Sequence, residues 1–327
     1  MNSNRAKHIN DCDGDLARQY GGSHTGKWVG KLPPSWIPFI QLARLSPPAG
    51  VFLVLFPHLY GIMHASILQQ ALSAQTIRTS MLVSVGSLFL SNAIHGWNDL
   101  VDAPIDKLVT RTKNRPIVRG AISPRAAFTF TASQALIGST LLLFLPGLTA
   151  VTAIPSIFAN FYYPFSKRHT YFTQFILGLS LAWGVNIGTI AMGAVPWEEK
   201  FLAPTACLFA ALVLWTVIYD TIYAFQDVQD DMNTGVKSTA VLFRQSAKIF
   251  LWSCLSLMVS FLSIYGQILE LGLGYYGLAV GGCAASLAVM ITKVNLQASP
   301  SCWWWFRYGF WLPGGFIAGG LVSQIDR

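Results

Sequence analysis

Long apolar segments recur along most of the chain, and short polar stretches separate them. A helix of about 20 apolar residues crosses the hydrocarbon core of a bilayer, so repeated segments of this length predict a polytopic membrane protein. Several segments contain Pro or Gly, for example Pro47-Pro48, which membrane helices tolerate when neighbouring helices satisfy the freed backbone groups. The pattern predicts an all-α bundle of nine spans, near residues 38–66, 79–97, 126–146, 148–165, 172–193, 203–224, 247–267, 273–294 and 304–323.

The composition agrees with this interpretation, because 53% of the residues are hydrophobic and only 11% are charged. Soluble domains carry about 25% charged residues. Residues 1–36 lack the apolar core of a signal peptide, and Asp11, Asp13 and Asp15 are unusual for a mitochondrial transit peptide, which is poor in acids. We therefore expect residues 1–36 to form a disordered cytosolic tail and residues 37–327 to form a single transmembrane domain.

The chain has a formal charge of +8, and its Lys and Arg residues gather in alternate loops. This alternation supports the number of spans and predicts that the N-terminus and the loops after the even-numbered spans face the cytosol. Aromatic and basic residues do not interleave as in proteins that grip single-stranded nucleic acid, so we expect no nucleic-acid partner. The loops predicted to be cytosolic hold Lys107, Arg111, Lys113, Arg115, Arg119 and Arg125, then Lys167 and Arg168, then Lys237 and Arg244.

The acidic residues are concentrated in two places. Fourteen residues are acidic, and seven of them lie in two short stretches at the predicted cytosolic ends of spans. Ionisable groups at membrane depth are costly and indicate function. In the first stretch, Asp99, Asp102 and Asp106 are spaced i, i+3 and i+7, which places them on one helical face unless Pro104 ends the helix.

The second stretch repeats this arrangement. Asp220, Asp227 and Asp231 are spaced i, i+7 and i+11, again one helical face, whereas Asp230 is displaced by one position. The segments "WNDLVDAPID" and "FQDVQDDMN" share the order aromatic, amide, Asp, x, x, Asp, and they lie four predicted spans apart. We interpret them as parts of a duplicated helical unit that brings two carboxylate clusters face to face.

Facing carboxylates repel each other and stay ionised only when positive charge lies between them. Mg²⁺ binds oxygen ligands, keeps several waters and bridges protein carboxylates to phosphate oxygens. The two clusters therefore predict bound Mg²⁺ and a phosphorylated substrate. No glycine-rich loop with a Walker lysine is present, so this is not a P-loop nucleotide site. Basic residues on the same predicted membrane face would stabilise charge on a leaving diphosphate: Lys113, Arg115, Lys167, Arg168 and Lys237.

These segments resemble the motifs of a known family. "NDLVDAPID" matches the N-D-x-x-D-x-x-x-D signature of UbiA-type membrane aromatic prenyltransferases. "DTIYAFQDVQDDMNTGVKST" is similar to their second motif, Y-A-x-x-D-x-x-D-D-x-x-x-G-x-K-S. The segments "RTKNRPIVRGAIS", "YYPFSKRHTYFTQFILGLSLAWG" and "RLSPPAGVFLVLFPHLYG" also resemble the family, so the likeness covers roughly residues 40 to 323.

The resemblance implies a helical bundle around a central cavity, in which Mg²⁺ holds an isoprenyl diphosphate. The allylic diphosphate would ionise, and its carbocation would attack an electron-rich aromatic ring. The resemblance also implies that the enzyme works within a lipid bilayer, and it implies no obligate protein partner. The implied catalytic residues are Asp99, Asp102, Asp227 and Asp231. The implied metal ligands are Asp99, Asp102, Asp106, Asp227 and Asp231. The implied diphosphate ligands are Asn98, Lys113, Arg115, Arg168 and Lys237, and Asp220 and Tyr223 would lie on the acceptor side.

Two departures bear on the acceptor. Ubiquinone-type members carry R-L-D-K-P where this chain has "RLSPP", and an Arg-Gly-rich stretch where it has "SNAIHGW". The motif sequences of this chain resemble more closely those of fungal members that prenylate aromatic polyketides. For these members farnesyl diphosphate is the expected donor. We therefore expect meroterpenoid biosynthesis in an endoplasmic reticulum-type membrane, with 4-hydroxybenzoate polyprenyl transfer in ubiquinone biosynthesis as the alternative. A membrane transporter is the alternative from another class, although transporter acids lie near the bilayer midplane.

Overall fold

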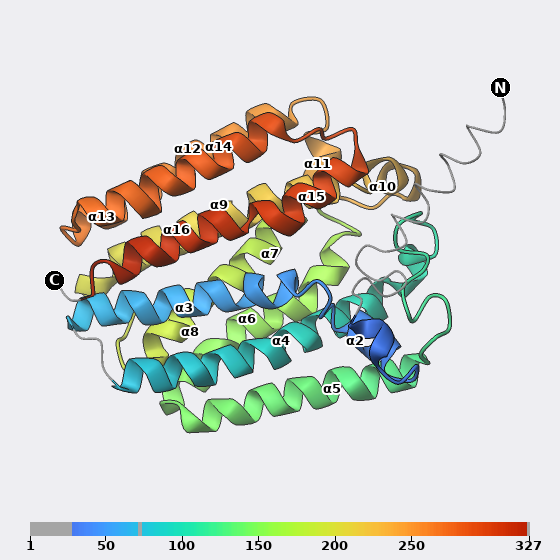
Figure 1. Cartoon of the computed structure of the whole chain (residues 1–327), viewed down its shortest axis with the longest axis horizontal. Coiled ribbons are helices and arrows are strands. Elements are labelled where there is room, and N and C mark those ends of the chain that lie inside the picture. The colour runs from blue at the N-terminus through green and yellow to red at the C-terminus, as the bar shows by residue number, and fades with distance from the viewer. Residues whose placement is uncertain (1–27, 71–73, 326–327) are drawn as a thin grey trace.

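The computed structural model describes residues 28–70 and 74–325, and all regular structure within these ranges is helical. Most of the predicted tail, residues 1–27, lies outside the described residues, and the first element is a 3₁₀ turn. Figure 1 shows the long helices lying side by side. The elements are η1 (Val29–Lys31), α2 (Ile37–Leu42), α3 (Ala49–Gln69), α4 (Ala74–Asp106), α5 (Pro124–Leu141), η2 (Leu142–Phe144), α6 (Gly147–Ser166), α7 (Thr173–Ala182), α8 (Gly184–Ala191), α9 (Glu199–Ala224), α10 (Val228–Thr234), α11 (Thr239–Leu242), α12 (Ala247–Ile268), α13 (Leu273–Tyr275), the π-helix η3 (Tyr276–Gly282), α14 (Cys283–Lys293), α15 (Ser299–Gly309) and α16 (Trp311–Val322).

Seven helical segments of the described chain are long and apolar enough to cross a membrane. The all-α, polytopic fold class is therefore confirmed, whereas the number nine stays a prediction. Helices also occupy the two other predicted positions: α6, and the consecutive pair α15 and α16. The seven segments are Ala49–Gln69, Ala74–Asp106, Pro124–Phe144, Thr173–Ala191, Glu199–Ala224, Ala247–Ile268 and Leu273–Lys293.

The first span differs from the prediction at its start. We expected one helix over 38–66 that tolerates Pro47-Pro48, but the short helix α2 ends at Leu42 and α3 begins only at Ala49. Two consecutive prolines remove two backbone donors and disfavour helix in the residues before them, so the chain leaves the helix there. The resulting loop carries Arg44, whose φ of 53° lies in the left-handed region, toward the end of α4.

Glycines allow α3 and α8 to pack with their backbones in close contact. A Cβ added to Gly61 would lie 2.1 Å from the carbonyl oxygen of Val185, and one added to Gly188 would lie 2.1 Å from that of His58. Small residues commonly allow this approach between membrane helices, where dispersion replaces the hydrophobic effect as the driving force. The contact fixes α8 against the helix that leads away from Arg44.

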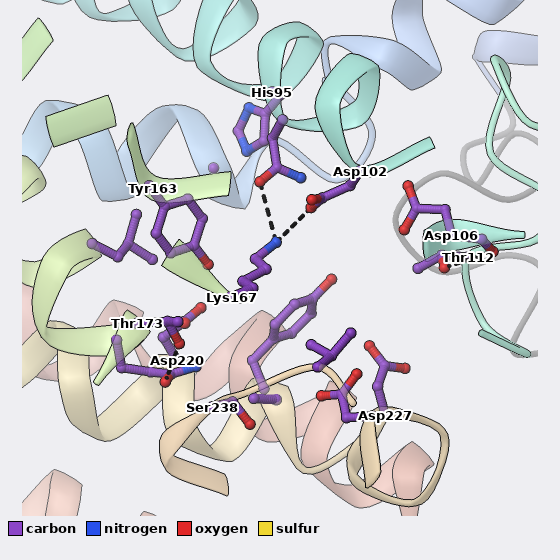
Figure 2. Close-up of a pocket in the computed structure, with 18 of the residues that line it drawn as sticks. His95, Asp102, Asp106, Thr112, Tyr163, Lys167, Thr173, Asp220, Asp227 and Ser238 are labelled. Carbon is purple, nitrogen blue, oxygen red and sulfur yellow. Dashed lines mark hydrogen bonds and ion pairs between the residues drawn. The ribbon is translucent and has the colours of Figure 1, made fainter. Parts of the chain in front are cut away.

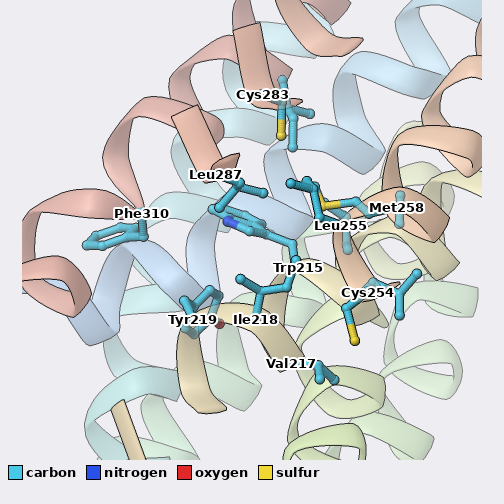
Figure 3. Close-up of a cluster of buried hydrophobic side chains, with 14 of the residues drawn as sticks. Trp215, Val217, Ile218, Tyr219, Cys254, Leu255, Met258, Cys283, Leu287 and Phe310 are labelled. Atoms are coloured by element: carbon cyan, nitrogen blue, oxygen red, sulfur yellow. The ribbon is translucent and has the colours of Figure 1, made fainter. Parts of the chain in front are cut away.

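The largest apolar core lies between α9 and the C-terminal helices. Trp215 on α9 is only 1% exposed. Side chains from α12 and α14 surround it, together with Phe310 between α15 and α16, as Figure 3 shows. Buried aromatic side chains carry a large share of the packing energy in such a core. This core holds α9 in place, and α9 ends at the second Asp stretch. Further members of the cluster are Ile218, Tyr219, Cys254, Leu255, Met258, Cys283 and Leu287.

Candidate functional site

Both Asp stretches line one cavity of about 170 Å³. Figure 2 shows Asp102 and Asp106 on one side of it and Asp220 and Asp227 on the other. The predicted face-to-face arrangement of the two stretches therefore agrees with the structure. Nine predicted site residues line the cavity: Asn98, Asp102, Asp106, Arg115, Asp220, Tyr223, Asp227, Asp231 and Lys237. Three do not: Asp99, Lys113 and Arg168.

The first wall is the last part of α4. The helix continues through Pro104 to Asp106, so Pro104 does not end it. A proline three residues from the end of a helix removes only one late hydrogen bond, which the packing around it offsets. Asp102 and Asp106 consequently lie one turn apart on the same face. Asp99 is only 1% exposed and lies behind the wall, not on its surface.

The second wall is not the single helix that the spacing predicted. Helix α9 ends at Ala224, and α10 begins at Val228, so Asp227 occupies the N-terminal cap position of α10 and Asp231 lies in its first turn. The chain bends here, yet the bend still directs both carboxylates into the cavity. Burial, and then the nearby Asp227, raises the pKa of Asp231 to about 8. Burial in this place therefore favours the protonated form of the Asp231 carboxyl group.

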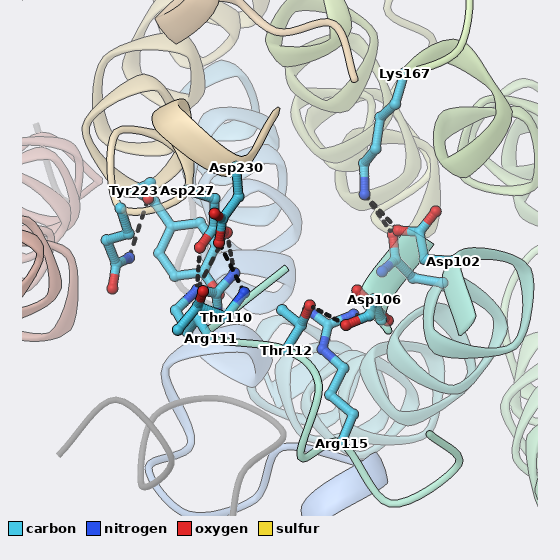
Figure 4. A network of polar contacts seen from close by, with 12 residues as sticks. Asp102, Asp106, Thr110, Arg111, Thr112, Arg115, Lys167, Tyr223, Asp227 and Asp230 are labelled. Atoms are coloured by element: carbon cyan, nitrogen blue, oxygen red, sulfur yellow. Dashed lines mark hydrogen bonds and ion pairs between the residues drawn. The ribbon is translucent and has the colours of Figure 1, made fainter. Parts of the chain in front are cut away.

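The protein's own cations neutralise the other carboxylates. Arg115 bridges the first stretch, with its Nη1 2.9 Å from Asp99 Oδ1 and 2.8 Å from Asp106 Oδ2. Lys167 Nζ lies 2.6 Å from Asp102 Oδ2. Part of the positive charge that we expected between the acids therefore comes from two basic side chains (Figure 4), and Mg²⁺ between the walls stays a prediction.

Arg111 connects the two walls and was missed as a site residue. Its Nε and Nη2 donate to the Asp227 carboxylate, with the shortest distance 2.5 Å, and its Nη1 donates to the Tyr223 hydroxyl at 2.8 Å. The loop after the first motif thus reaches the second motif directly, as Figure 4 shows. The sequence feature that could have identified Arg111 as a site residue is its position five residues after Asp106, in the most basic loop of the chain.

Arg44 was also missed. Its Nη2 lies 2.8 Å from Asp99 Oδ1, and it lines the cavity. An arginine directly before the Pro-Pro break, at the membrane edge that carries the Asp motifs, was the signal that could have found it.

The predicted basic residues outside the cavity have other contacts. Arg168 donates to the carbonyl oxygens of Pro164 and Val101, which joins α6 to α4. Lys113 is exposed on the loop surface. Asp230 accepts a hydrogen bond from the backbone N–H of Thr110 at 2.7 Å, so it fastens the loop and does not line the cavity. Sequence spacing had set Asp230 apart from Asp227 and Asp231, but it could not separate Lys113 and Arg168 from the basic residues that line the cavity.

Removing Arg115 should destabilise the protein. Arg115→Ala leaves Asp99 and Asp106 without their shared partner in a buried place, and breaking such a pair costs about 3–5 kcal/mol. We expect a clearly lower thermal midpoint in detergent for this variant. The matched control is Lys113→Ala, two residues away and exposed, which should keep the midpoint of the unmodified protein. Equal midpoints for both variants would contradict the bridging role of Arg115.

The cavity has the chemistry that a divalent cation requires. Asp102 Oδ1 is buried and has no hydrogen-bond partner in the described chain. Among the described residues, no group of three or more His, Cys, Asp or Glu side chains forms a complete metal cage. Mg²⁺ sites that serve phosphates use only one or two carboxylates and take the remaining ligands from substrate and water. The carboxylates of Asp102, Asp106, Asp227 and Asp231 could hold a cation in this way.

The cavity is polar at one end and apolar elsewhere. Its apolar lining comes from α3, α4, α7 and α15. A molecule with an anionic head and a hydrocarbon body matches this division of the lining, because each half meets its preferred surroundings. The apolar lining residues include Leu53, Val54, Ile94, Leu177, Leu181 and Phe306.

The chain is similar to characterised prenyltransferases. The prenyltransferase ascA of Acremonium egyptiacum is 33% identical over 273 residues, which cover 83% of this chain and 81% of the relative. The DMOA farnesyltransferase nvfB of Aspergillus novofumigatus is 32% identical over 300 residues, covering 89% and 94%. The mitochondrial 4-hydroxybenzoate polyprenyltransferase of Saccharomyces cerevisiae is 34% identical over 295 residues, covering 90% and 78%.

A solved structure and a family match agree with these relatives. The UbiA homolog from Archaeoglobus fulgidus, bound to GPP and Mg²⁺, superposes with a TM-score of 0.65 at 17% identity, covering 88% of this chain and 99% of that one. This likeness shows the fold alone. Residues 54–313 match the UbiA prenyltransferase family. Together with the relatives above, this match shows that the chain belongs to the UbiA prenyltransferase family and is a prenyl-transferring membrane enzyme.

Proposed function

We propose that the enzyme joins the farnesyl group of farnesyl diphosphate to a ring carbon of a phenolic polyketide acid, in the biosynthesis of a meroterpenoid. The observation that carries the proposal is a single cavity that combines two carboxylate-bearing walls, five cationic side chains and an apolar lining. The printed name of nvfB, a farnesyltransferase, supports the choice of donor. The five cationic side chains are Arg44, Arg111, Arg115, Lys167 and Lys237.

We assign Mg²⁺ as the metal, held by Asp102 and Asp106 on one wall and by Asp227 and Asp231 on the other. The related protein from Archaeoglobus fulgidus with GPP and Mg²⁺ supports this assignment. When bound, the ion supplies positive charge that offsets the charge of the diphosphate. Asp99, which lies behind the wall, would contribute by holding Arg44 and Arg115.

The basic side chains are the protein's own contribution to ionisation of the donor. Arg115 and Lys167 lie on the side of the first stretch, and Arg111 and Lys237 lie near the second. Preorganised cations of this kind stabilise the negative charge that develops on a leaving group. Asn98 would add an amide that hydrogen-bonds the diphosphate. Asp220 and Tyr223 would orient the aromatic acceptor from the α9 side.

Two alternatives remain for the experiment to decide. The yeast relative, a 4-hydroxybenzoate polyprenyltransferase, supports an acceptor of ubiquinone biosynthesis. Against it stand the departures in "RLSPP" and "SNAIHGW", because the second segment contributes His95 to the cavity lining and the changed residues of the first closely follow the lining residue Arg44. A transporter would leave without a purpose the ion pairs that four of the clustered acids form with basic residues at one end of the bundle.

We place the cavity at the cytosolic face of an endoplasmic reticulum-type membrane. The concentration of Lys and Arg in the loops on this side supports the orientation.

Incubation of membranes that contain the protein tests the proposal. The membranes receive farnesyl diphosphate and a panel of phenolic acids that includes orsellinic-type polyketides and 4-hydroxybenzoate, and products are identified by mass spectrometry. We expect a farnesylated polyketide acid. Selective prenylation of 4-hydroxybenzoate would support the ubiquinone alternative, and membranes without the protein serve as the control.

Lys237→Ala should weaken donor binding more than acceptor binding. Lys237 lines the cavity beside Asp231, where its ammonium group would meet the diphosphate and not the aromatic ring. Charge-assisted hydrogen bonds to phosphate are about twice as strong as neutral ones. We expect KM for the donor to rise while KM for the acceptor changes little, measured with each substrate varied in turn. An equal rise in both values would contradict the assignment.

A further inference from the structure

His95 on α4 lines the cavity, and none of the proposed contacts to donor, metal or acceptor involves it. It precedes Asn98 and Asp102 at i, i+3 and i+7, so the three side chains share one helical face. Three residues correspond to about 4.5 Å along a helix axis. In Figure 2 the imidazole lies beside the first wall, across the cavity from Asp220 and Asp227. The imidazole therefore lies about 4.5 Å further along α4 from the diphosphate-binding end than Asn98 does. At this depth the allylic carbon of the donor and the aromatic ring of the acceptor would meet.

The hydrogen bonds of His95 define which nitrogen can accept a proton. Nδ1 lies 2.8 Å from the backbone carbonyl oxygen of Ser91. A carbonyl oxygen can only accept, so Nδ1 carries the hydrogen and Nε2 of the neutral ring keeps its lone pair. Within the described residues, Nε2 has no hydrogen-bond partner. The ring thus offers a proton acceptor that no other group uses.

Gly50 at the start of α3 makes room for this edge of the ring. A Cβ added there would lie 2.3 Å from Cε1 and 2.7 Å from Nε2 of His95, which is far inside van der Waals contact. Gly50 also lines the cavity, so the Cε1–Nε2 edge is held at its surface. The position of the imidazole therefore depends on a glycine from another helix.

Three of the nearby carboxylates are poorer candidates for the same task, whereas Asp220 forms no ion pair with a described residue and is compared with His95 in the test below. Asp102, Asp106 and Asp227 each form an ion pair with Lys167, Arg115 or Arg111. A paired carboxylate is a weaker base, because the cation favours its charged form. Nε2 of His95, by contrast, forms no ion pair or hydrogen bond within the described residues and lies on a side chain that lines the cavity.

We infer that Nε2 of His95 accepts the proton that leaves the aromatic ring of the acceptor, an inference that rests on the proposed function. The allylic C–O bond breaks, and its electron pair leaves on the diphosphate. The ring then forms the new C–C bond to the allylic carbon. Finally the ring C–H bond breaks, its electron pair restores aromaticity, and its proton moves to Nε2 and later to water.

Kinetics with a ring-deuterated acceptor test this inference. In the unmodified enzyme, proton removal should be fast, so the isotope effect on kcat should be near unity. In His95→Gln, kcat should fall about 10²-fold, KM for the donor should stay nearly constant, and a clear normal isotope effect should appear. The matched control is His58→Gln, whose Nδ1 makes the same bond to the carbonyl oxygen four residues earlier, at Val54, but which does not line the cavity. This control should keep its kcat.

A second variant separates chemistry from folding. His95→Ala should regain activity when imidazole is added, which a purely structural histidine would not allow. Unchanged kcat and isotope effect in His95→Gln would overturn the inference, and so would a fall in kcat with neither an isotope effect nor rescue. An isotope effect in Asp220→Asn alone would assign the proton to Asp220 instead. If the unmodified enzyme prenylates no aromatic acceptor, the proposed function fails, which the unmodified enzyme reveals by itself.

Discussion

Asp227→Asn should lower prenyl transfer by about 10²- to 10³-fold, the cost of losing one electrostatic group aimed at developing charge. Asn has nearly the same shape as Asp and keeps one oxygen that can accept a hydrogen bond from Arg111. The contact between Arg111 and residue 227 is therefore weakened but not lost. One of the two carboxylates that the second wall offers to a cation is lost, and Asp231 remains. Product formation in membranes, normalised to the amount of protein, measures the effect.

The control for this variant lies three residues away. Asp230→Asn removes a carboxylate from the same short segment, but Asp230 does not line the cavity and only binds the backbone of Thr110. It should keep most of the activity. A variant Asp227→Asn that is as active as Asp230→Asn would overturn the role of the second wall. Elution as a single species in detergent would show that both variants are folded.

Chelation should have an effect as large as the mutation. Incubation with EDTA should stop prenyl transfer, and added Mg²⁺ should restore it. The reason is that three of the basic side chains are already paired with carboxylates, so they offset only part of the negative charge of a diphosphate. The measurement is the initial rate before chelation, after it and after addition of Mg²⁺. Turnover that continues unchanged in EDTA would contradict a metal-bound diphosphate.

Much of the fold and half of the site could be predicted from the sequence. Apolar length predicts the membrane helices, and the spacing of Asp102 and Asp106 predicts their shared face because the helix does continue through Pro104. The bend between α9 and α10 could not be predicted, because the spacing of Asp220 and Asp227 fits a helix equally well. Spacing describes a helix once it exists and does not reveal where it ends.

The pairing of charges was the other part that needed coordinates. Arg111 and Lys113 are two residues apart in one basic loop, yet the first is buried against Asp227 and the second is exposed. Arg44 reaches Asp99 only because the chain leaves the helix at Pro47-Pro48. The orientation bias of membrane loops favours basic residues at all these positions, so sequence alone could not distinguish a ligand from a topological signal.

Binding of a non-ionisable donor analogue tests the central claim most directly. Farnesyl thiolodiphosphate is titrated into the purified protein in Mg²⁺ and again in EDTA, and into Asp102→Asn in Mg²⁺. We expect tight binding to the unmodified protein in Mg²⁺ and a large loss of affinity in both other cases. Equal affinity in all three titrations would contradict a divalent cation between the Asp-bearing walls of the cavity and the diphosphate.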